Sequence, residues 1–137
     1  MDADEVRRRV HDARVGRLAT VRPDGRPHLV PICFAVVGDT IVSTVDDKPK
    51  VTTSLQRLRN IAANPNVTLL VDYYDEDWAQ VWWARVDGTA RVVEDGAERD
   101  AAVAALHGKY DQYDVIGQSG PAVVIDATDW RGWAYSG

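Results

Sequence analysis

Short segments with strand character follow one another along this chain, and strong turn signals separate them. The clearest is Arg22-Pro23-Asp24-Gly25, which joins two segments in a hairpin because Pro fixes its own φ and Gly tolerates a positive φ. The expected strands are 16–21, 27–37, 40–45, 67–73 and 80–93, with a bend near 88 and two short strands within 122–135; the expected helices are 4–13, 53–63 and 97–107. This order predicts a mostly β protein, a closed antiparallel barrel with peripheral helices, and leaves an α+β sandwich as the alternative.

Composition and charge exclude several classes of protein. A length of 137 residues suits one domain over 1–137, and a net charge of −5 argues against a general nucleic-acid binder. No apolar run approaches the roughly 20 residues of a membrane span, and the N-terminus lacks the apolar region of a secretory signal, so we expect a cytoplasmic protein without membrane contact. Cys33 is the only cysteine, which excludes an intrachain disulfide, and we expect no metal site because His and Cys lack ligand spacing.

A basic loop and the helix after it stand out in this acidic chain. Lys48 and Lys50 lie in the loop, Thr53 lies at the expected helix start with a hydroxyl residue on either side, and Arg57 follows in the second turn. Free backbone N–H groups at a helix N-terminus, together with nearby cations, form a ready anion site. The pattern therefore favours a phosphorylated small molecule. The alternatives are a solvated lysine loop, a plain N-cap at Thr53 and an exposed helical arginine at 57.

An ordered set of motifs carries a family resemblance. The segments GRLATVRPDGRPHLVPICF, IVSTVDDKPK and LRNIAANPNVTLLVD resemble the pyridoxamine 5'-phosphate oxidase-like flavin and deazaflavin proteins, over about 15–93. The continuation DYYDEDWAQVWWARVDGTARV is most similar to the branch of probable F420-dependent enzymes. The resemblance implies an FMN-binding-like split β-barrel, a homodimer, and a flavin-type cofactor in the groove between subunits.

The resemblance also implies roles for residues on the first strands and the basic loop. Lys48 best fits the family's basic position for the cofactor phosphate. In the family, residues at the end of the third strand pass beside the cofactor ring or phosphate, which slightly favours Thr44 as a binding residue. The resemblance also implies that the irregular backbone at Pro31 lies against the cofactor ring. Pattern alone makes Thr44 an ordinary strand position and Pro31 the mark of a sheet edge or a bulge. Asn60 either reaches the cofactor or makes a structural hydrogen bond.

In the family, the region equivalent to that around His28 reaches the cofactor tail from the other subunit, so the resemblance implies this role for His28. The alternative is a surface histidine. A poly-glutamate tail would attract cations, so three arginines near the first hairpin become candidates: Arg17, Arg22 and Arg26. Cys33 is expected to be a small buried hydrophobe rather than a nucleophile.

Tryptophan is abundant near the middle of the chain. Trp82 and Trp83 are adjacent, so on a strand they face opposite sides, one toward the core and the other toward a groove or a dimer partner. Trp78 follows an acidic loop and is the better candidate to cover a planar ring, with core packing as the alternative.

No paired-carboxylate, Ser-His-Asp or Cys-His arrangement is evident, so the catalytic residues are unknown. The absence of such motifs is expected if a cofactor carries the chemistry while the protein binds and orients that cofactor. We expect an F420-dependent oxidoreductase that transfers a hydride to a small organic substrate. FMN is the alternative cofactor, and the alternative functions are a non-catalytic F420 or flavin carrier and a structural dimer without a ligand.

Overall fold

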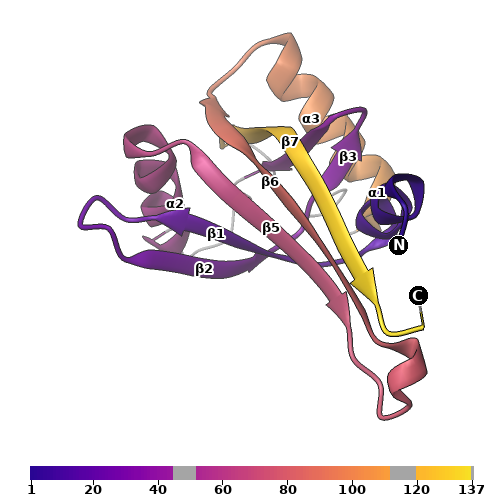
Figure 1. Cartoon of the computed structure of the whole chain (residues 1–137). Coiled ribbons are helices and arrows are strands. Elements are labelled where there is room, and N and C mark those ends of the chain that lie inside the picture. The colour runs from indigo at the N-terminus through magenta and orange to yellow at the C-terminus, as the bar shows by residue number, and fades with distance from the viewer. Residues whose placement is uncertain (45–51, 112–119, 137) are drawn as a thin grey trace.

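In the computed structural model, the chain forms a single curled antiparallel sheet with three helices around it (Figure 1). The structure describes residues 1–44, 52–111 and 120–136. The elements are α1 (Ala3–Asp12), β1 (Gly16–Val21), β2 (Pro27–Ile32), β3 (Ala35–Val37), β4 (Thr40–Thr44), α2 (Thr52–Ala63), β5 (Asn66–Tyr73), the short 3₁₀ helix η1 (Trp78–Gln80), β6 (Trp82–Val93), α3 (Ala97–Lys109) and β7 (Ala122–Ala134). The expected mostly β class with peripheral helices is confirmed.

The two outer strands of the sheet are neighbours in the sequence. The strand order is β2-β1-β5-β6-β7-β4-β3, and only Cys33 and Phe34 separate β2 from β3. A chain that leaves one edge and enters the other within two residues forces the sheet to curl into a split barrel. The prediction of one strand over 27–37 was therefore wrong, because β2 pairs with β1 while β3 pairs with β4. The edge expected from Pro31 is confirmed, since β2 ends the sheet.

Tyr110 holds the backbone at this break. Its hydroxyl accepts the N–H of Phe34 at 3.2 Å and lies 3.1 Å from the Phe34 carbonyl and 2.9 Å from the Arg14 carbonyl. Phe34 itself is fully buried, so its polar backbone needs a partner inside the protein. Cys33 is exposed, which corrects the expectation of a buried thiol. The chain bends here and alternation between the two faces is lost.

Strands β6 and β7 pair along their whole lengths. The pairing runs from Trp82 opposite Ala134 to Val93 opposite Ala122, with a register shift at Asp87/Gly88. The bend expected near Gly88 is confirmed, and a Cβ there would lie 2.5 Å from a carbonyl oxygen of β7. The expectation of two short strands within 122–135 was wrong, because β6 supplies hydrogen bonds to one continuous partner.

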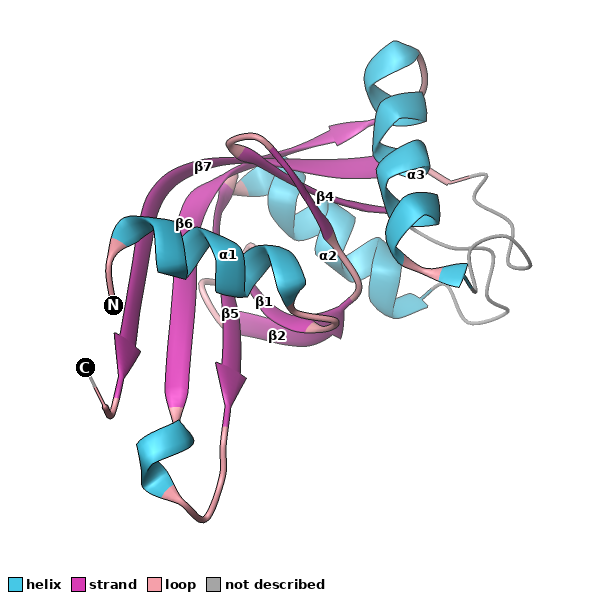
Figure 2. Cartoon of the chain, turned by 90° about the vertical axis from the view of Figure 1, so that its right-hand side faces the viewer, coloured by secondary structure: helices cyan, strands magenta, loops and turns pink. Residues whose placement is uncertain are grey.

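Each helix covers a different part of the sheet. Helix α1 buries Val6 and Val10 against β6 and β7, and Asp2 caps it by accepting the Glu5 N–H at 2.8 Å (Figure 2). Helix α2 packs on β1 and β6, and α3 packs on β3 and β4. No helix in the described ranges is long and apolar enough to cross a membrane.

Candidate functional site

A polar cluster joins α2 to the first hairpin. We define the α2 cluster as Thr20, His28, Gln56, Arg57 and Asn60. The Asn60 amide donates from Nδ2 to Thr20 Oγ1 at 3.0 Å, and its Oδ1 accepts from Gln56 Nε2 at 2.7 Å. Because Asn60 is completely buried, these bonds fix α2 on β1. The structural hydrogen bond considered for Asn60 is thus present, and we assign this residue to positioning.

His28 lies directly opposite Thr20 in the β1–β2 pair. Its side chain is buried at 9% exposure, so the surface alternative was wrong. Burial lowers the pKa of the His28 imidazole, and the positive charges of Arg22 and Arg57 lower it further. Among the described residues, no group hydrogen-bonds its Nδ1. The imidazole is consequently neutral at pH 7 in a positive field.

Arg57 points its charge into the protein rather than into solvent. Its side chain is 8% exposed, which makes the exposed-arginine alternative wrong. A guanidinium stays charged when buried and offers five donors in a planar fork. With His28 beside it, Arg57 forms a region of positive potential that an anionic group such as a phosphate would offset.

The basic loop itself falls outside the described residues. Lys48 and Lys50 belong to the segment 45–51, and Thr53 lies in the first turn of α2 without a described side chain. The ends of the loop are clear. Thr44 is buried at the end of β4 opposite Ala122, and α2 begins at Thr52. The segment 45–51 therefore joins β4 to the helix that carries the α2 cluster.

Pro31 and Trp78 have no contact with the residues of this cluster that the structure describes. Pro31 is exposed on β2 opposite Arg17. Trp78 is 58% exposed in η1, at the end of the β5–β6 hairpin farthest from α2 (Figure 1). The core-packing alternative for Trp78 was wrong. Trp82 does pack on the core, as one of the adjacent pair was expected to do.

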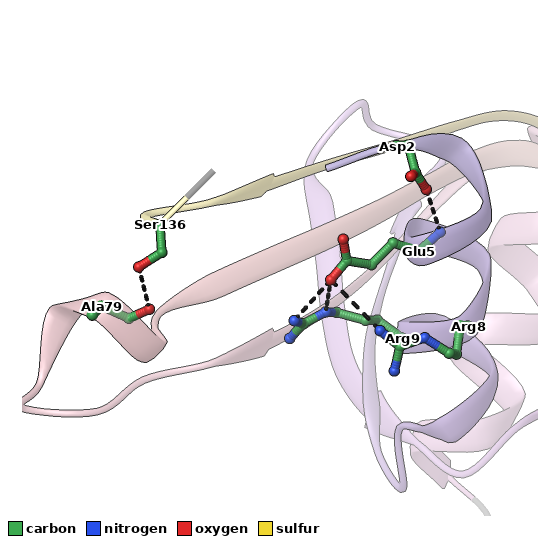
Figure 3. A network of polar contacts seen from close by, with 6 residues as sticks. All are labelled: Asp2, Glu5, Arg8, Arg9, Ala79 and Ser136. Atoms are coloured by element: carbon green, nitrogen blue, oxygen red, sulfur yellow. Dashed lines mark hydrogen bonds and ion pairs between the residues drawn. The ribbon is translucent and has the colours of Figure 1, made fainter.

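Exposed aromatic side chains lie around Trp78, and we call them the aromatic arm: Tyr74, Trp78, Trp133 and Tyr135. Tyr135 makes edge-to-face contacts with both tryptophans, each at 6.4 Å between ring centroids. Ser136 donates to the Ala79 carbonyl at 2.7 Å and ties the end of the chain to η1 (Figure 3). The arm is held in shape although its rings are exposed.

Sequence reasoning missed Thr20 and Gln56. The spacing of Gln56 and Asn60 puts both amides on one face of α2, and this signal could have found Gln56. Thr20 carried no signal, because a threonine in an alternating strand is ordinary.

Comparison with known proteins identifies the family. The family model described as "Pyridoxamine 5'-phosphate oxidase" matches residues 3–134 of this chain. No curated protein matches it.

Several solved structures share the fold. A conserved hypothetical protein from Mycobacterium tuberculosis has a TM-score of 0.79 at 24% identity, over 98% of this chain and 85% of that one. The heme storage protein HutZ from Vibrio cholerae has a TM-score of 0.73 at 16% identity, over 96% and 93%. The FAD binding protein from Mycobacterium smegmatis has a TM-score of 0.64 at 24% identity, over 97% and 95%. At these identities the likeness shows the fold.

The family match covers every element of the sheet, from the start of α1 to the end of β7. The curled sheet, closed through Cys33 and Phe34, is the split barrel expected from the motifs. This chain belongs to the pyridoxamine 5'-phosphate oxidase family, which includes oxidoreductases with a flavin-type cofactor.

Proposed function

We propose that this protein is an F420-dependent oxidoreductase that transfers a hydride to a small organic substrate. The family match supports a flavin-type cofactor. The resemblance of 72–92 to the probable F420-dependent branch supports the deazaflavin over FMN. When bound, the deazaflavin ring supplies the hydride transfer.

The observation that carries the proposal is the positive field of the α2 cluster. Two guanidinium charges, on Arg22 and Arg57, act on the buried His28. The residues present fit a phosphate, because Arg57 offers a fork, His28 has an unsatisfied ring nitrogen, and α2 begins directly after the lysine loop. In this proposal Arg57, Lys48 and Lys50 hold the phosphate, while Asn60 and Thr20 keep α2 in place.

The proposed assembly is a homodimer with the cofactor in the groove between subunits. The aromatic arm supports it, since large exposed rings are typical of interfaces and its four rings lie together. In the proposed dimer, Trp78 of one subunit would cover the cofactor ring held by the other, and Thr44 and Pro31 would contribute to the binding of that ring. Sedimentation at a range of protein concentrations tests the assembly, and a monomer at all of them would contradict it.

A fluorescence titration with F420 and with FMN tests the cofactor. We expect saturable F420 binding and much weaker FMN binding. Tighter FMN binding would keep the phosphate site and change the enzyme class, whereas no binding of either would contradict the proposal. Binding without reduction across a broad substrate panel would favour the carrier function.

Substitution of Arg57 tests the phosphate contact. Loss of one charged hydrogen bond costs about 1.5–3 kcal/mol, so Arg57→Met should weaken F420 binding roughly tenfold or more. Arg59→Met is the matched control, because Arg59 is an exposed arginine of the same helix. Circular dichroism shows whether the variants fold, and Arg57→Lys supplies a milder variant that keeps the charge. Equal affinity in folded Arg57→Met protein would remove the assignment.

A further inference from the structure

Lys109 is a lysine with an unusual environment. It is the last residue of α3, and its amine nitrogen is buried without a hydrogen-bond partner among the described residues. The amine lies 4.1 Å from the centroid of the Phe34 ring and 5.3 Å from that of Tyr110. Ring faces attract a cation but do not replace the hydrogen bonds that an ammonium group makes in water.

A cavity of about 540 Å³ lies beside this lysine, between the end of α1, strand β3 and the last turns of α3. We call it the Lys109 cavity. Arg14 and Lys109 form its basic wall, and Ala35, Val36 and Ala105 form an apolar wall. The volume is sufficient for a small organic molecule. The cavity therefore offers a charged end and an apolar end.

Positive charge in the Lys109 cavity is only partly balanced, since Arg14 and Lys109 face one carboxylate, that of Asp12. Burial and the nearby positive charge of Arg14 together lower the pKa of the Lys109 amine to about 8. Asp12 also lines the cavity, and its carboxylate, which lies 3.0 Å from His11 Nδ1, offsets part of this charge at a distance. Within the described ranges, no carboxylate lies within ion-pair distance of Arg14 or Lys109. An anion would relieve the repulsion between these two cations.

We propose that the Lys109 cavity binds a small organic carboxylate, with the acid group on Lys109 and Arg14 and the apolar body against Ala35 and Val36. The flexible stem of Lys109 lets the amine turn from the rings toward the ligand. An acid with an apolar body matches both walls, which a fully hydrated inorganic anion does not. This site is separate from the α2 cluster and does not depend on the cofactor.

The test uses protein labelled with ¹³C at the lysine ε carbon. The chain has three lysines, so the Lys109 signal is assigned by its loss in Lys109→Arg. Benzoate is the probe and benzamide its neutral control. We expect benzoate to shift the Lys109 signal saturably and to raise the midpoint of its pH titration, while benzamide changes neither. An equal response to benzamide, or a shift no larger than those of Lys48 and Lys50, would overturn the proposal.

Two variants locate the binding by calorimetry. Lys109→Met should weaken benzoate binding at least tenfold, whereas Lys109→Arg keeps the charge and should retain most of it. Arg131→Met is the matched control, because Arg131 is exposed on β7 and pairs with Asp129 away from the cavity. Unchanged benzoate affinity in folded Lys109→Met protein would overturn the proposal. If Lys109→Met does not fold, the same loss is expected in Arg14→Met, and unchanged affinity there has the same meaning.

Discussion

The α2 cluster and the Lys109 cavity both concentrate positive charge in an acidic protein, but they hold it differently. In the α2 cluster the charge belongs to guanidinium groups, which remain charged at any pH at which the protein folds. In the Lys109 cavity part of the charge belongs to an amine whose pKa is lowered to about 8. The first site is a permanent anion site, and the second gains or loses charge near neutral pH.

Each site contains a nitrogen without a hydrogen-bond partner among the described residues, on His28 and on Lys109, but the α2 cluster also contains a fully paired amide. Asn60 in the α2 cluster has polar partners on both sides, Thr20 and Gln56. Lys109 packs its amine on Phe34 and Tyr110, and the Tyr110 hydroxyl serves the backbone instead. A satisfied network fixes a helix, whereas an unsatisfied amine is ready for a ligand.

The largest expected effect is on the free energy of unfolding, at the closure of the barrel beside the Lys109 cavity. Tyr110→Phe removes the hydroxyl and leaves the buried N–H of Phe34 without its partner, so it should lower the free energy of unfolding by about 3 kcal/mol. Tyr135→Phe is the control, since that tyrosine is exposed, and should change it by less than about 0.5 kcal/mol. Urea denaturation measures both. Equal stability of the two variants would mean that the hydroxyl does not hold the break.

A smaller loss is expected in the α2 cluster. Asn60→Ala leaves Thr20 and Gln56 without their shared partner and should cost about 2 kcal/mol of stability. Asn66→Ala, at an exposed position that begins β5, is the matched control and should be nearly neutral. Urea denaturation measures the stability of both variants. A neutral Asn60→Ala would show that the network does not fix α2.

The pH dependence of stability separates the two kinds of charge. The pKa of Lys109 is about 8 in the folded protein and near 10.5 unfolded, so the unfolded chain holds more protons between these values. Stability should therefore rise with pH above about 8, by about 1–2 kcal/mol up to pH 9.5 after allowance for screening. Lys109→Met should remove this rise. Higher pH is avoided because burial raises the pKa of Tyr110, and its linkage has the opposite sign.

The smallest effect is electrostatic and lies within the α2 cluster. The midpoint of the His28 titration should fall below the ordinary 6.5, because burial and two arginines disfavour the imidazolium. The midpoint of the His28 titration should rise in Arg57→Met and should not change in Lys109→Met. Proton NMR of the three histidines measures this, with His28 assigned through His28→Gln. An unaltered midpoint in Arg57→Met would mean that the charge of Arg57 does not act on His28.

Local sequence signals predicted most of the elements but not the closure of the barrel. The Pro23-Asp24-Gly25 turn and the bulge at Gly88 depend on a few neighbouring residues, so their patterns were sufficient. The break at Cys33–Phe34 depends on Tyr110, which lies 76 residues away from Phe34, and no local pattern contains it.

The same limit applies to the sites. Arg57 and Asn60 were predicted because they follow the basic loop within one helix. Lys109 was missed, since a lysine in the last turn of a helix usually faces water and stabilises the dipole. Only the packing of α3 on β3 and β4 places its amine against Phe34.

The most direct test of the phosphate assignment is the pH titration of His28 by NMR, with and without saturating F420. If the cofactor phosphate lies in the field of Arg57 and Arg22, its negative charge offsets that field, and the pKa of His28 rises on binding. An unchanged His28 titration in protein that has bound F420 would place the phosphate elsewhere and contradict the account.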